Sequence, residues 1–196
     1  MAQKRQTRTE AKIKAAYTRI VKAKGFDALT VSDLAREADI NRGTFYMHYV
    51  DKFDLRQQLI DDTIDELTSI LIPKDASADA LEIGDIIRTD DIVEALRYIK
   101  RDYEFIDAVS NGGTDMQLHD RIKDVIRQLL LSQVSRLRTP PSGFADFPQE
   151  YAQEILVSAV TSILWLWIRR RCRESPETIC DIIERNKVTA PIDILR

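Results

Sequence analysis

The stretch that decides the fold is TVSDLAREADINRGTFYMHYVDK, residues 30–52. It contains two short helical patterns, one ending near Ala38 and one from Arg42 to Tyr49, separated by Asp39-Ile40. Thr30 and Asn41 precede these patterns, and both residue types are favoured at helix N-caps. Two short helices with so tight a connection have the outline of a helix-turn-helix.

The second of these helices has two distinct faces. Successive residues of a helix lie about 100° apart, so Phe45 and Tyr49 share one face, which we expect to pack inward. The opposite face and its flanks carry the other side chains: Arg42, Gly43, Thr44, Tyr46, Met47 and His48. A helix of this kind can enter a major groove with its middle near base edges and its flanks near the two phosphate backbones.

The residue types of the outward face suit DNA. The guanidinium fork of Arg42 can bond guanine O6 and N7, and Gly43 lets the backbone approach closely. Donors suited to phosphate oxygens are carried by Thr44, Tyr46 and His48. Lys52 adds charge at the start of the next helix. Taken singly, each of these residues is more often core or solvated surface, and only the joint pattern is specific.

The charge is divided unevenly along the 196 residues. Residues 1–50 hold ten Lys or Arg against five Asp or Glu, a charge of +5. The whole chain carries −3, so the remainder carries −8. A basic head on an acidic body predicts that the head binds a polyanion.

Helical periodicity continues through most of the chain, because only six Gly and six Pro interrupt it. The first helix starts from the Thr7/Glu10 capping box and ends near Gly25, and Asp51 caps a long fourth helix to Leu71. Further helices are expected at Asp90–Lys100, Tyr103–Val109, Asp115–Leu137, Pro148–Arg171 and Pro176–Asn186. The predicted fold is all-α with about nine helices: a three-helix DNA-binding head (1–52, with the helix-turn-helix at about 30–49), joined by the long fourth helix to a regulatory and dimerisation bundle (53–196).

Residues 9–55 resemble the N-terminal domain of the TetR family of bacterial transcriptional regulators. The resemblance rests on Gly25-Phe26, Leu29-Thr30-Val31, Asp33–Ala38, Arg42–Tyr46, His48-Tyr49, Asp51-Lys52 and Leu55. It implies that Thr30, Thr44, Tyr46, His48 and Lys52 hold phosphates and that Arg42 and Gly43 approach bases. Asp39-Ile40-Asn41 stands where the family often has Gly-Val-Ser, and Asp accepts a left-handed turn less easily than Gly.

The segment Ile155–Ile168 is apolar nearly all round its helix and must be buried on more than one side. A second subunit is the natural cover, and the resemblance also implies dimerisation through the last two long helices; the alternative is a central helix buried in a monomer. The expected dimer interface consists of Ile155, Ala159, Ile163, Leu166, Trp167, Ile179, Ile182 and Ile183. A dimer would place two recognition helices roughly 34–36 Å apart.

The resemblance also implies a small-molecule pocket in the body. Candidate lining residues are Phe53, Leu67, Leu96, Tyr98, Tyr103, Phe105, Met116, Ile126, Leu130 and Tyr151. At helical spacing such residues are more often ordinary core, and none of them specifies a ligand.

Other classes of function find little support. Cys172 and Cys180 are not at zinc spacing and His119 has no second ligand nearby, so we expect no metal and no cofactor. No nucleophile–base motif indicates an enzyme. The apolar run is short and interrupted by polar residues, and no signal peptide precedes it, which predicts a cytoplasmic protein without a membrane span.

Two hypotheses therefore share the DNA-binding head. In the first, a homodimeric repressor binds a pseudo-palindromic operator and a small-molecule effector in the body releases it. In the second, the body docks a protein co-regulator instead. An enzyme built on the helical body is the third and least supported alternative.

Overall fold

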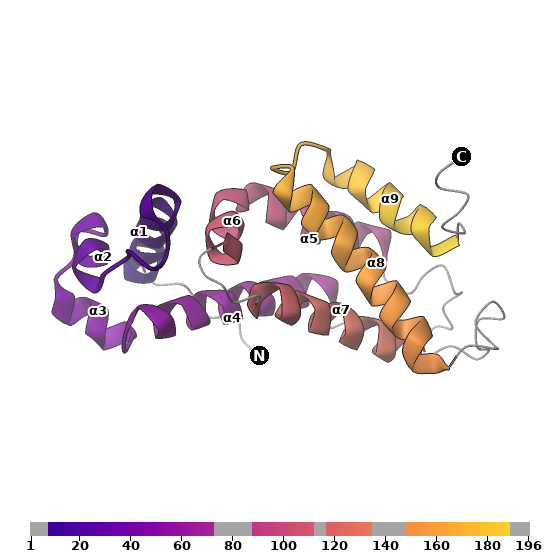
Figure 1. Cartoon of the computed structure of the whole chain (residues 1–196), viewed down its shortest axis with the longest axis horizontal. Coiled ribbons are helices and arrows are strands. Elements are labelled where there is room, and N and C mark those ends of the chain that lie inside the picture. The colour runs from indigo at the N-terminus through magenta and orange to yellow at the C-terminus, as the bar shows by residue number, and fades with distance from the viewer. Residues whose placement is uncertain (1–7, 73–87, 112–116, 135–147, 189–196) are drawn as a thin grey trace. The chain divides into compact units, whose positions relative to one another are not determined.

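A computed structural model describes residues 8–72, 88–111, 117–134 and 148–188. These residues form nine helices and no strand, which confirms the all-α fold (Figure 1). The helices are α1 Arg8–Lys24, α2 Val31–Glu37, α3 Arg42–His48, α4 Lys52–Leu71, α5 Thr89–Arg101, α6 Tyr103–Asn111, α7 Gln117–Val134, α8 Gln149–Arg169 and α9 Pro176–Val188.

The chain divides into two compact units. The first is formed by residues 1–63 and 104–118 and the second by residues 64–103 and 119–196, so that α4 contributes residues to both. The expected boundary of the DNA-binding head at residue 52 lies within the first unit and stays a prediction.

The first unit contains the three-helix head and α6. Its core is built from apolar side chains that the amphipathic pattern turns inward, and the fully buried members include Ile13, Tyr17, Leu34, Phe45 and Leu55. Two contacts join α1 to α6. Lys22 forms an ion pair with Glu104 at 2.7 Å, and the Lys14 ammonium lies 3.9 Å from the ring centroid of Phe105.

Local hydrogen bonds fix where the helices of the head begin. The Thr30 hydroxyl oxygen accepts from the backbone N–H of Asp33 at the start of α2. Asn41 caps α3, and the Asp51 carboxylate accepts from the N–H groups of residues 53 and 54 at the start of α4. All three caps are as predicted, because a capping side chain needs only partners two or three residues away. Thr7 lies outside the described residues.

The turn between α2 and α3 is left-handed. Asp39 has φ 53°, the conformation that a glycine would adopt most easily. Asp and Asn tolerate this region better than most residues do. The departure from Gly at this position therefore leaves the turn intact.

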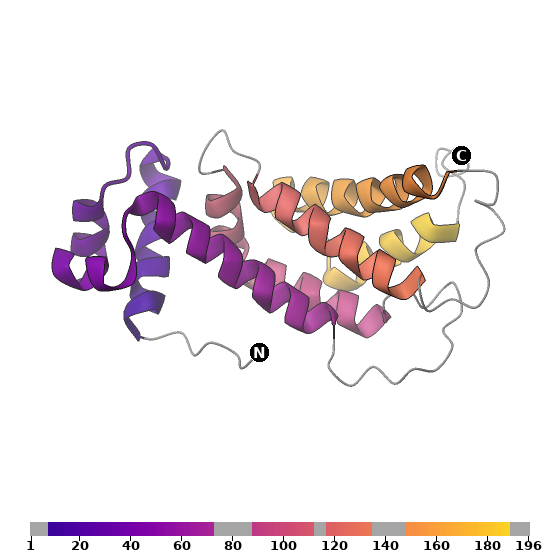
Figure 2. The ribbon, with the colours of Figure 1, turned by 90° about the horizontal axis from the view of Figure 1, so that it is seen from below.

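In the second unit α9 packs against α5 and α8 (Figure 1). An ion pair of 2.8 Å joins Arg97 of α5 to Glu177 of α9. Glu154 of α8 pairs with Lys123 and Arg127 of α7, and Figure 2 shows these two helices side by side. After α8 the chain turns through two left-handed residues, Arg171 and Cys172, before α9 begins.

One described helix, Glu150–Arg169, is long and apolar enough to span a membrane by length and composition, with a mean hydropathy of 1.4. The sequence predicts a run too short and too polar for a span, and this helix instead meets the criterion of length and composition. A core helix of a soluble protein can meet the same criterion. In the most apolar 18-residue stretch of this helix 22% is buried inside the chain, so much of its surface is open.

Candidate nucleic-acid interface and effector cavity

The recognition helix α3 is anchored on one side and open on the other. Phe45 is fully buried and Tyr49 is 6% exposed, with their ring centroids 5.5 Å apart. Burial and the nearby carboxylate of Glu10 raise the pKa of Tyr49 to about 12, so its hydroxyl stays neutral. On the outward side Tyr46 is 52% and Met47 is 84% exposed. The predicted inward and outward faces of this helix are confirmed.

The first turn of α3 explains why a glycine follows Arg42. The side-chain oxygen of Asn41 accepts from the Thr44 N–H at 2.7 Å and from the Thr44 hydroxyl at 3.1 Å. A Cβ on Gly43 would lie 3.1 Å from that same Asn41 oxygen. Glycine therefore leaves room for the cap as well as for a close approach of the backbone to a ligand.

Arg42 is the basic group of α3 that is available for a ligand. Its side chain is exposed, and within the described ranges it has no hydrogen-bond or ion-pair partner. Several neighbouring cations are engaged: Arg19 with Glu37, Lys24 and Arg36 with Asp33, and Lys12 with Asp39. His48 is half-buried, with its Nδ1 3.6 Å from Glu10 Oε1.

The hydroxyl of Thr30, a predicted phosphate contact, also donates to Asp33 Oδ2 at 2.6 Å. Hydrogen bonds from Lys24 and Thr30 hold the pKa of the Asp33 carboxyl well below its usual range. Thr30 is exposed, but its hydroxyl hydrogen is already donated to Asp33 within this local network.

Lys52, the last predicted phosphate contact, has a similar internal role. Its ammonium donates to three backbone oxygens of the segment between α1 and α2: Phe26 at 3.2 Å, Asp27 at 2.9 Å and Leu29 at 3.1 Å. The ammonium also lies 5.0 Å from the ring centroid of Phe26 and 5.4 Å from that of Phe53. A lysine has three N–H donors, so Lys52 ties α4 to the segment before α2.

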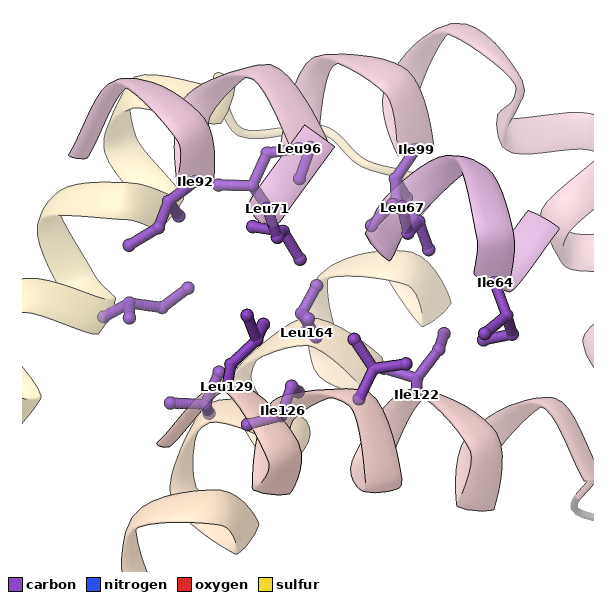
Figure 3. A pocket seen from close by; sticks show the side chains of 14 residues that line it. Ile64, Leu67, Leu71, Ile92, Leu96, Ile99, Ile122, Ile126, Leu129 and Leu164 are labelled. Atoms are coloured by element: carbon purple, nitrogen blue, oxygen red, sulfur yellow. The ribbon is translucent and has the colours of Figure 1, made fainter. Parts of the chain in front are cut away.

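The second unit contains an apolar cavity of about 80 Å³ between its helices (Figure 3). Its walls come from the end of α4 and from α5, α7, α8 and α9, and every lining residue in the described part of the chain is aliphatic. They are Ile64, Leu67, Leu71, Ile92, Ala95, Leu96, Ile99, Ile122, Val125, Ile126, Leu129, Val160, Leu164 and Ile183.

The cavity includes three of the predicted pocket residues, Leu67, Leu96 and Ile126. The aromatic candidates lie elsewhere, because the aliphatic faces of the helices meet around this space. Tyr98 and Phe105 are buried away from its lining, Tyr103 is half-buried, and Phe53 and Tyr151 are exposed. Met116 and the side chain of Leu130 lie outside the described residues. The signal that could have identified the missed residues was the aliphatic spacing of three or four along α4, α5 and α7.

The predicted dimer residues divide into two groups. Ile155, Leu166 and Ile182 are exposed, and Ala159 and Ile163 are half-buried. Trp167, Ile179 and Ile183 are instead core residues of the subunit, with exposed fractions of 1%, 4% and 3%. The burial of these three side chains has a packing reason: α8 and α9 turn them toward their own bundle. Ile183 lines the cavity, and the Trp167 indole donates to the Glu174 carbonyl at 3.2 Å.

The capped helix pair, with its outward α3 face on a basic head, defines a helix-turn-helix DNA-binding protein. Residues 13–59 match the family described as bacterial regulatory proteins, tetR family. Residues 89–186, half of the chain, match a transcriptional regulator C-terminal region of the same family. The chain belongs to the TetR family of transcriptional regulators, and its N-terminal domain is the family's DNA-binding domain.

One curated relative is an uncharacterized HTH-type transcriptional regulator from Bacillus subtilis, YxbF, which is 24% identical over 173 residues. The match covers 87% of this chain and 42% of that protein, so the chain spans less than half the length of this relative.

Two solved structures show the same fold. The fatty acid degradation regulator FadR from Bacillus halodurans has a TM-score of 0.65 and 14% identity, over 96% of this chain and 98% of that one. FadR from Bacillus subtilis, solved in complex with stearoyl-CoA, has a TM-score of 0.60 and 11% identity, over 91% and 97%.

Proposed function

We propose that this regulator is a cytoplasmic homodimeric repressor that binds a pseudo-palindromic operator through α3 and is released by an apolar effector. The observation that carries the DNA-binding part is the split of α3, with Phe45 and Tyr49 anchored in the core and Arg42, Tyr46 and Met47 exposed. Arg42 would bond a guanine edge, and Thr44, Tyr46 and His48 would hold the flanking phosphates.

The dimer is supported by the exposed apolar side chains of α8 and α9. Tyr151, Ile155, Leu166 and Ile182 are all more than two-fifths exposed in the single subunit. Exposed apolar surface of this kind marks an interaction site, and a second copy would cover it with the same surface. The interface so proposed uses Ile155, Ala159, Ile163, Leu166 and Ile182, with Tyr151 in addition.

The effector site is proposed to be the aliphatic cavity of the second unit. Because the described residues that line it are all aliphatic, the cavity favours a hydrocarbon chain over a polar metabolite. The stearoyl-CoA in the B. subtilis FadR structure supports the idea that this fold can hold a long acyl chain. A volume of about 80 Å³ is well below the roughly 300–1,000 Å³ of drug-sized ligand sites. An acyl chain must therefore widen the bundle. If the acyl chain binds the widened conformation more tightly than the narrow one, it shifts the protein toward the widened conformation and so releases it from the operator.

The small cavity also favours the second candidate function, in which the body docks a protein co-regulator. In that case the cavity is a packing defect between aliphatic helices. The two candidates share the DNA-binding head and differ only in what the body binds.

The operator part is tested by selecting bound fragments from a genomic library and footprinting them. A dimer of this kind should protect two half-sites whose centres are about 10–10.5 base pairs, or a multiple of this, apart. Protection of a single unrepeated site would contradict the dimeric reading.

The effector part is tested by thermal unfolding with acyl-CoA esters of increasing chain length, with free coenzyme A as the control. A true ligand at one hundred times its Kd should stabilise the protein by about 2.7 kcal/mol. The Ile126→Phe variant should lose this shift because its ring fills the cavity, whereas Val50→Phe, at a position of the first unit that is 77% exposed, should keep it. If no acyl-CoA ester of the series changed the thermal unfolding, and the body captured one defined protein, the co-regulator function would be favoured.

A further inference from the structure

Met47 is more exposed than any other large apolar side chain among the described residues, at 84%. It lies on α3 opposite the buried anchors Phe45 and Tyr49, and most of its surface is open to water. Arg42 and Tyr46 carry polar groups on this outward surface, but a thioether side chain has no donor to offer DNA.

The major groove has one apolar group at the base edges, the C5-methyl of thymine. A methionine side chain is long and flexible and adapts well to small apolar groups. Gly43 lies one helical turn before Met47 and has no side chain, so the preceding turn of this face puts no side chain between Met47 and the floor of the groove. The position of Met47 on α3 and the apolar character of its side chain therefore both indicate a thymine C5-methyl as its contact on DNA.

We propose that Met47 is a specificity-determining residue that contacts a thymine C5-methyl in each half-site of the operator. This inference rests on the proposed binding of α3 in the major groove and adds one base to it. Arg42 would read a guanine by hydrogen bonds, and Met47 would read a thymine by exclusion of water from two apolar surfaces. The Met47 contact would be insensitive to salt, because no counterion is released when an uncharged group binds.

The test replaces each thymine of the selected operator by deoxyuridine, which lacks only the methyl group. Each operator is then titrated with the wild-type protein and with Met47→Ala. Loss of one buried methyl corresponds to about a four-fold weaker affinity per half-site at roughly 0.8 kcal/mol for each group. We expect this loss at one symmetry-related pair of thymines for the wild type, and no discrimination between thymine and uracil at that pair for Met47→Ala.

Two further variants serve as controls. Met47→Leu keeps an apolar end and should retain the preference for thymine. Val50→Ala removes another exposed apolar side chain, just beyond α3, and should leave the discrimination at this pair unchanged. The substitutions are at exposed positions, so thermal unfolding should confirm that all variants are folded.

The outcomes distinguish a failure of the Met47 assignment from a failure of the proposed operator binding on which it rests. If wild-type binding is unchanged by uracil at every position, or if the sensitive pair stays sensitive in Met47→Ala, the assignment of Met47 is wrong while operator binding stands. If no operator can be selected and binding does not depend on Arg42 or Tyr46, the proposed function fails and this inference fails with it.

Discussion

The side-chain oxygen of Asn41 accepts a hydrogen bond of 2.7 Å from the backbone N–H of Thr44 and so begins the recognition helix. Replacing Asn41 by Ala should lower the free energy of unfolding by about 1 kcal/mol, because a helix N-terminus loses its cap. Asn41→Asp keeps an acceptor and should be close to wild type. Urea denaturation of the three proteins measures both effects, and equal losses in the two variants would show that the cap is not the cause.

Lys52 should act on the stability of the head rather than through phosphate charge. Lys52→Met removes three charge-assisted hydrogen bonds to backbone oxygens and should cost about 1.5–3 kcal/mol. The matched control is Lys22→Met, because among the described residues Lys22 pairs only with the exposed Glu104, and its loss should cost under about 1 kcal/mol.

DNA titrations over a salt series then separate the two roles of Lys52. Loss of a phosphate contact reduces the slope of log affinity against log salt by about 0.9. We expect the slope of Lys52→Met to match that of the wild type. If Lys52→Met instead reduced the slope by the equivalent of one contact in each half-site and left the stability unchanged, Lys52 would be a phosphate contact, as the resemblance implies.

The interactions of Glu154 make the stability of the second unit depend on pH in the acidic range. Hydrogen bonds from Lys123, Arg127 and Ser158 lower the pKa of its carboxyl from 4.5 to about 2. A carboxyl whose pKa is lower in the folded state stabilises the protein above its unfolded pKa, and this stabilisation is lost as the pH falls from about 4.5 to about 2. Glu154→Gln should therefore show a shallower fall of unfolding free energy over this window, with exposed Glu150→Gln as the control. A slope identical to the wild type would contradict the assignment.

The dimer proposal predicts that one charge on α8 is enough to separate the subunits. Leu166 is 51% exposed in the single subunit, so Leu166→Glu should leave the subunit folded while placing an unpaired carboxylate in the proposed interface. Ile72→Glu is the control, because Ile72 is exposed to a similar degree, 46%, but does not lie on α8 or α9. Sedimentation equilibrium should show a monomer only for Leu166→Glu; a dimer in both variants would place the interface elsewhere.

The features that could be predicted from the sequence are those with local causes. Thr30, Asn41 and Asp51 mark helix starts because their partners are two or three residues away. The inward turn of Phe45 and Tyr49 follows from helical periodicity alone.

The features that could not be predicted depend on contacts distant in the sequence. The acceptors of Lys52 lie 23 to 26 residues earlier, so no local pattern indicates them. Trp167 is on α8, which is apolar on several sides, and only packing decides which side meets the bundle. Ile182 and Ile183 are adjacent on α9, and only packing decides that Ile183 is the one that is buried. The cavity likewise arises where the aliphatic faces of five helices meet, and its residues carry no distinguishing type.

The central claim is that α3 binds DNA with Arg42 reading a base and Tyr46 holding a phosphate. The most direct measurement is fluorescence anisotropy on the selected operator and on a scrambled duplex, for wild type, Arg42→Ala and Tyr46→Ala. We expect Tyr46→Ala to weaken binding to both DNAs, and Arg42→Ala to cost about 1–3 kcal/mol on the operator and to reduce its advantage over the scrambled duplex. If both variants bound the operator as tightly as the wild type, the assignment of α3 as the DNA-reading surface would be wrong.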